Sequence, residues 1–90
     1  MMYPFMTLQD GTEIVHSDVM PDGRVKVFAE KPDEKDGFHD VTCWLPDYEW
    51  GPVHGLSDAE LAQIRDVVEG AAHLIMRFAS DGGVEHAKAV

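Results

Sequence analysis

The chain has 90 residues, of which 17 are acidic and 7 are basic, so its formal net charge at pH 7 is −10. A chain of this length has room for one modest hydrophobic core, which predicts a single domain over residues 1–90. The negative charge argues against direct binding to nucleic acid or to an anionic membrane, because both interactions depend largely on lysine and arginine.

Several features of the sequence indicate a cytoplasmic protein. No apolar stretch approaches the ~20 residues that a membrane span needs. Residues 1–5 lack the basic and apolar segments of a secretory signal. The single cysteine, Cys43, cannot form an internal disulfide, and small exported domains without disulfides are less usual. We therefore expect a cytoplasmic location.

Turn signals divide the first half of the chain into four expected strands, at about 5–8, 12–20, 24–30 and 38–45. Asp10-Gly11 and Pro21-Asp22-Gly23 are typical of tight hairpins, and a longer charged connection precedes the fourth strand. Apolar residues alternate along the third and fourth strands, so one row should face the core. This core row is expected to contain Val25, Val27, Ala29, Val41, Cys43 and Leu45.

One amphipathic helix is expected at about 58–80. Ser57 and Glu60 have capping-box spacing, and the apolar residues that follow recur at three- and four-residue steps. The glycine- and proline-rich segment 46–56 is expected to be an ordered loop, and residues 84–90 a C-terminal tail. The predicted fold class is therefore α+β, a four-stranded antiparallel β-meander with one C-terminal helix packed on one face. Facing strand and helix positions predict one core shared by Val27, Val41, Leu45, Ile64, Val68 and Ile75.

No motif in the sequence fixes a reaction. His39 and Cys43 share a strand face, but four strand residues span roughly 13 Å, too far for a thiolate–imidazole pair. His16, the other possible partner of Cys43, is expected on the opposite face. The histidines form no helical pair and no short cluster with cysteine, and the acidic connection 33–37 lacks the ligand pattern of a calcium loop. We expect no catalytic residue, no metal and no cofactor.

The second face of the predicted sheet is expected to carry large apolar residues. One helix covers only one face, so these residues are exposed unless the N-terminal segment, the Trp50 loop or a second copy covers them. The residues expected on this face are Ile14, His16, Phe28, Phe38, Thr42 and Trp44. We predict a partner-binding surface with the anchors Phe28 and Trp44 and the carboxylates Asp18, Glu30, Asp33, Glu34, Asp36, Asp40, Asp47 and Glu49.

Three segments of the chain resemble small uncharacterised acidic proteins carried by bacterial phages and mobile elements. They are Tyr3-Pro4-Phe5-Met6-Thr7, Asp22-Gly23-Arg24-Val25-Lys26-Val27 and Cys43-Trp44-Leu45-Pro46. The resemblance covers most of the chain and supplies no catalytic residues. What it implies is an inhibitor of host defence, since small acidic proteins from such elements often inhibit host defence systems, some of them by presenting carboxylates to a basic nucleic-acid-binding groove.

The sequence thus leads to an acidic protein-interaction module, in the form of an anti-CRISPR-like or other anti-defence inhibitor. Its expected partner is a basic protein or protein complex, such as a nucleic-acid-binding defence complex. Two alternatives remain open: an antitoxin-like or accessory regulator that neutralises a basic partner, and a small structural homodimer. A small enzyme that uses Cys43 or the histidines has no motif to support it.

Overall fold

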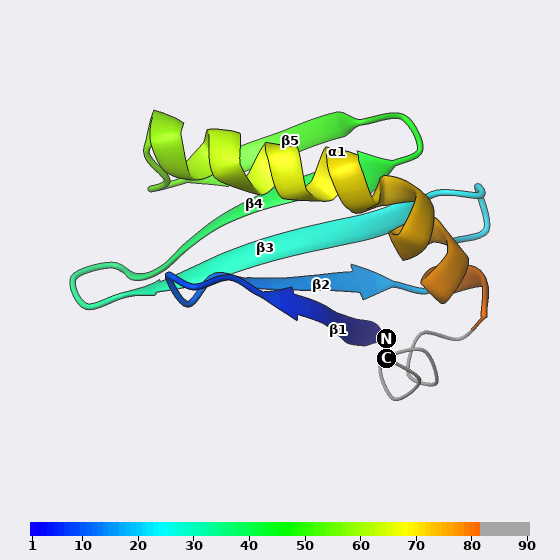
Figure 1. The fold of residues 1–90 in the computed structure, drawn as a ribbon, viewed down its shortest axis with the longest axis horizontal. Coiled ribbons are helices and arrows are strands. Elements are labelled where there is room, and N and C mark those ends of the chain that lie inside the picture. The colour runs from blue at the N-terminus through cyan, green and yellow to red at the C-terminus, as the bar shows by residue number, and fades with distance from the viewer. Residues whose placement is uncertain (82–90) are drawn as a thin grey trace.

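The computed structural model describes residues 1–81 as an antiparallel sheet with one helix along one of its faces (Figure 1). The five strands lie side by side in chain order. They are β1 (Met2–Thr7), β2 (Glu13–Ser17), β3 (Val25–Asp33), β4 (Gly37–Leu45) and β5 (Glu49–His54), and the helix is α1 (Asp58–Ser80). The predicted α+β class is confirmed, but the predicted number of four strands is wrong.

The additional strand, β5, lies within the segment 46–56 that was predicted to be a loop. Gly51 and Pro52 suggested irregular structure there, but an edge strand tolerates proline because one side of its backbone has no neighbour to bond. β5 pairs with β4 through a register that shifts between Val41 and Cys43. The predicted tail 84–90 lies outside the described residues.

The predicted hairpin turns and helix start are present. The Leu8 N–H donates to the carbonyl of Thr12 at 2.8 Å, with Gly11 at φ 91° between them, and Gly23 at φ 85° closes the next hairpin. Positive φ at this position is what a short hairpin connection demands of its glycine. The expected capping box begins α1, since the Ser57 hydroxyl accepts from the Glu60 N–H and the Glu60 carboxylate accepts from the Ser57 N–H.

One core lies between α1 and the sheet. It contains all six residues predicted to share it, three from β3 and β4 and three from the helix. Val27 pairs with Cys43 and Ala29 with Val41, so the alternating rows of the two strands coincide on the helix side. Within residues 1–81, no helix combines the length and apolar character needed to span a membrane.

The placement of Ile14 and His16 on the face away from the helix was wrong. Ile14 pairs with Ala29 and His16 pairs with Val27, which puts both side chains under α1, each 1 % exposed. In a strand the side-chain period is two, so an error of one position moves every side chain to the other face. Glu13 and Val15 therefore point away from the helix.

Candidate functional site

The face of the sheet opposite α1 is covered by no other helix or strand among residues 1–81, and we call it the open face. Its residues alternate with the buried residues of β2, β3 and β4. They are Glu13, Val15, Lys26, Phe28, Glu30, Pro32, Phe38, Asp40, Thr42 and Trp44. Phe28, Trp44, Glu30 and Asp40 of the predicted surface thus share one face.

Three carboxylates lie in a row across the open face. Glu13 of β2 is the cross-strand partner of Glu30 in β3, and Glu30 is the partner of Asp40 in β4. Side chains at directly opposed positions have Cβ atoms about 4.5–5.5 Å apart, and like charges there destabilise the sheet. The row concentrates negative charge at the middle of three adjacent strands.

Only one of the three carboxylates has a side-chain partner within residues 1–81. Within the described part of the chain, Glu13 and Glu30 form no ion pair, whereas Asp40 lies 2.8 Å from Nδ1 of His54 on β5. The row therefore retains unbalanced negative charge that a cation from outside the chain could offset.

Two aromatic rings on one side of the carboxylate row, Phe28 and Trp44, each lie beside a cation of this chain. The Lys26 ammonium is 6.0 Å from the centre of the Phe28 ring, and the Arg24 guanidinium is 4.7 Å from the Trp44 ring. Cations within about 6 Å of an aromatic face are attracted by its quadrupole. The open face therefore combines the two kinds of group, carboxylate and aromatic, that bind lysine and arginine.

Other predicted site carboxylates already have partners within the chain. Arg24 lies 3.6 Å from Asp47 and 3.3 Å from Glu49, and it also pairs with Asp22 in the turn before β3. Asp18 accepts a hydrogen bond from the Tyr3 hydroxyl at 2.8 Å, which raises the pKa of that hydroxyl. These three predicted residues stabilise the end of the sheet remote from the carboxylate row.

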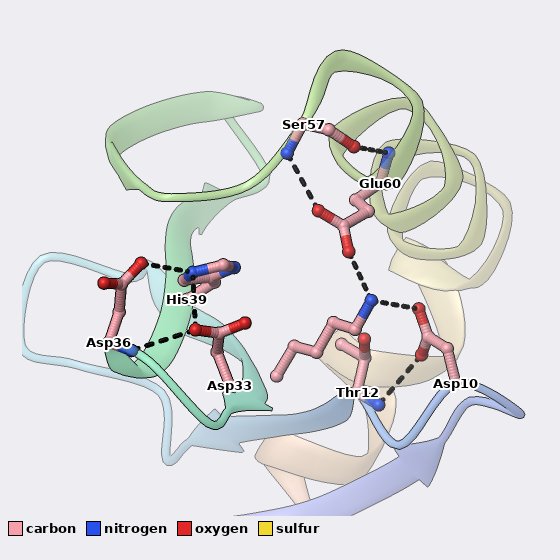
Figure 2. Close-up of polar contacts among 8 residues, drawn as sticks. Asp10, Thr12, Asp33, Asp36, His39, Ser57 and Glu60 are labelled. Atoms are coloured by element: carbon pink, nitrogen blue, oxygen red, sulfur yellow. Dashed lines mark hydrogen bonds and ion pairs between the residues drawn. The ribbon is translucent and has the colours of Figure 1, made fainter.

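The predicted residues at the β3–β4 turn form a separate polar cluster, shown on the left of Figure 2. Asp33 accepts from the backbone N–H of Asp36 at 2.9 Å, and Asp36 lies 2.9 Å from Nε2 of His39. The hydrogen bond to Asp36 raises the pKa of His39. Glu34 lies exposed in the same turn. A Cβ on Gly55, at φ 78°, would clash with the imidazole, so the ring occupies space that only a glycine leaves free.

One potential ligand atom each from Asp33, Asp36 and His39 lies within 4.8 Å of the others, a spacing compatible with a metal ion. Hydrogen bonds among these three side chains and the turn backbone account for the arrangement without an ion. The cluster forms the polar tip of the β3–β4 hairpin.

A second polar group fastens the helix start to the sheet, on the right of Figure 2. The Lys31 ammonium on β3 bonds the carboxylate of Glu60 in α1 and lies 3.8 Å from Asp10 in the β1–β2 turn. The hydrogen bond from Lys31, together with the Ser57 N–H, lowers the pKa of Glu60 from 4.5 to about 2. This group joins three elements that are distant in sequence.

The lowered pKa of Glu60 predicts a defined acid sensitivity. Ionised Glu60 stabilises the folded chain fully above about pH 4.5, and this contribution is lost as the pH falls through about 2. We expect Glu60→Gln to lower the thermal midpoint at neutral pH, and the difference from wild type to narrow below about pH 4. The control is Glu69→Gln on the exposed side of α1, where the same charge change should leave the midpoint nearly constant. A difference that is independent of pH would contradict the assignment.

Among residues 1–81, Cys43 forms no thiolate–imidazole pair. His16 on β2 and Cys43 on β4 share the helix side of the sheet, and each is the cross-strand partner of Val27 on β3. Two strand spacings, roughly 10 Å, therefore separate the imidazole from the thiol. Burial raises the pKa of Cys43 to about 11, so its thiol is neutral at physiological pH. Cys43 is a packed core residue, as predicted.

Glu13 is the member of the carboxylate row that the sequence analysis missed. The assignment of Ile14 to the wrong face removed Glu13 and Val15 from the predicted surface. The sequence signal that could have placed Glu13 on this face is the alternation of β2, counted from the Asp10-Gly11 turn. The pairing of Glu13 with Glu30 in the structure follows that alternation.

No protein-family model, curated protein or solved structure matches this chain.

Proposed function

We propose that this protein is an acidic protein-interaction module whose open face binds a basic surface of another protein. The observation that carries the proposal is the row Glu13–Glu30–Asp40, in which carboxylates oppose one another on three adjacent strands. Such a row costs stability in the isolated chain, and solubility requires only an evenly mixed surface. A cationic partner offsets this cost on binding.

The partner class that best fits this chemistry is a nucleic-acid-binding surface. Such surfaces present lysine and arginine to phosphates, and they often add aromatic contacts to bases. The carboxylate row opposes the cations, while Phe28 and Phe38 offer apolar contact on either side of it. This supports the specific form of an anti-CRISPR-like or other anti-defence inhibitor, in which the protein occupies a groove otherwise used by nucleic acid.

A short arginine-rich peptide is a suitable probe, with a glutamine-substituted peptide as its neutral counterpart. Neutralising the row in Glu13→Gln/Glu30→Gln should weaken binding of the basic peptide by about tenfold or more, measured by calorimetry. Affinity of the wild type should fall as salt is raised, because exposed charges are screened over ~8 Å at physiological ionic strength.

The matched control is Asp66→Asn/Glu69→Gln, which makes the same change in net charge on the exposed side of α1. It should bind nearly as tightly as wild type. The open-face variant should also keep its thermal midpoint or raise it, because the substitutions relieve repulsion between strands. Equal loss of affinity in both variants would show that net charge alone attracts the peptide, and would overturn the open face as the site.

A further inference from the structure

We propose that, in the absence of a basic partner, the open face pairs with the open face of a second copy of this chain about a two-fold axis that crosses β3 at Phe28. The basis is the order of charges along this strand, which is the middle strand of the sheet. Lys26, Phe28 and Glu30 occupy successive outward positions of β3. The cation and the carboxylate each lie two residues, roughly 6.6 Å, from the central aromatic ring.

This order is self-complementary for one orientation of the two sheets. A two-fold axis perpendicular to β3 in the plane of the interface reverses the strand, so Lys26 lies over Glu30 of the second copy and the Phe28 rings meet. An axis parallel to β3 would instead place Glu30 over Glu30 and Lys26 over Lys26, which like charges disfavour. Among residues 1–81, neither Lys26 nor Glu30 forms an ion pair within its own chain, so both are available.

The neighbouring strand β4 follows the same symmetry. Trp44 and Asp40 lie on opposite sides of Thr42 and are the cross-strand neighbours of Lys26 and Glu30. The same axis therefore brings Trp44, with Arg24 beside it, over Asp40 of the second copy. Because Arg24 already pairs with Asp22, Asp47 and Glu49, the charge match across the axis rests on Lys26 and Glu30 of β3, and β4 adds the apolar ring of Trp44.

The edges of the sheet are poorly suited to self-association. β1 contains Pro4 and β5 contains Pro52, and the pairing of each edge strand with its neighbour has a register shift. Proline and irregular edges oppose the addition of a further strand. Pairing of copies through the open face avoids this obstacle.

The size of the face sets the expected strength of this contact. Five strands spaced about 4.8 Å apart make a face roughly 19 Å wide, and β3 and β4 are roughly 30 Å long. Two such faces bury on the order of 1,000 Å² in total, near the lower limit for specific interfaces. The dimer should therefore depend on concentration and should compete with the basic partner for the same face.

Sedimentation of the full chain, without any partner, tests the arrangement. Wild type should pass from monomer to dimer between micromolar and several hundred micromolar concentrations. Lys26→Glu and Glu30→Lys should each raise the dissociation constant about tenfold or more, and the exchange variant Lys26→Glu/Glu30→Lys should restore it. Both positions are on the surface, and circular dichroism of each variant verifies that it is folded.

Cysteine cross-linking tests the axis. Facing sheets lie about 10 Å apart, too far for a direct disulfide, so the cross-link is made with a short bifunctional thiol-reactive reagent. Phe28→Cys should be linked between two copies, whereas Glu30→Cys should be linked only when mixed with Lys26→Cys. A wild type that remains monomeric throughout, or a dimer indifferent to both charge reversals, would overturn the proposal. Because no partner is present, that result would leave the proposed function standing, and failure of the peptide to bind would leave the dimer standing.

Discussion

Replacing Ile75 with alanine is expected to lower the free energy of unfolding by about 2–5 kcal/mol. Ile75 is fully buried between α1 and the sheet, in the cluster that forms the core. Because α1 is the only helix among residues 1–81, no second layer is present there to compensate for the cavity. Denaturant titration measures the change directly.

The neighbouring Leu74 provides a matched control, since it is on the same helix but 43 % exposed. Leu74→Ala should change stability by about 0.5 kcal/mol or less. For a domain of this size, the Ile75→Ala loss corresponds to a fall in thermal midpoint of at least roughly 8 °C. Similar small effects of both substitutions would show that this side of α1 does not pack on the sheet.

Cys43 is expected to react with a thiol reagent at neutral pH at least about 100-fold more slowly than the unfolded chain. Its pKa is raised from 9.0 to about 11 by burial, which alone lowers the thiolate fraction about 100-fold, and the side chain is 1 % exposed. Labelling kinetics in buffer and in denaturant give the ratio.

The labelling rate of Cys43 should also report opening of the core. If the thiol reacts only when the sheet and helix separate, Ile75→Ala should accelerate labelling in proportion to its loss of stability, while Leu74→Ala should not. Rapid stoichiometric labelling of the folded wild type would contradict burial and would restore Cys43 as a candidate reactive group.

The fold was predictable where local chemistry and tertiary packing agree. Alternation in β3 and β4, glycine-closed turns and the Ser57 capping box led to four of the five strands, to the core and to the helix bounds. β5 was not predictable by the same rules, because glycine and proline within it oppose strand structure locally. Only its pairing with β4, a contact at the sheet edge, makes it a strand.

The candidate site was predictable only in part, because carboxylates near one another in sequence have different partners. Glu30 and Asp40 belong to the carboxylate row, but Asp47 and Glu49 pair with Arg24. Partner choice of this kind depends on which turns lie together in space. Placing Glu13 on the open face required the register of β2 against β3. The sequence of this segment allows more than one alternation, so it does not determine that register.

The two tryptophans allow the most direct test of the claim that the open face binds a basic partner. Trp44 lies on the open face, whereas Trp50 packs against the core and its indole Nε1 is buried. In a nuclear magnetic resonance titration with the arginine-rich peptide, the Trp44 indole signal should shift in a saturable manner while the Trp50 signal stays in place. Shifts confined to the hairpin tip 34–36 or to Trp50, with Trp44 unchanged at saturation, would contradict the account.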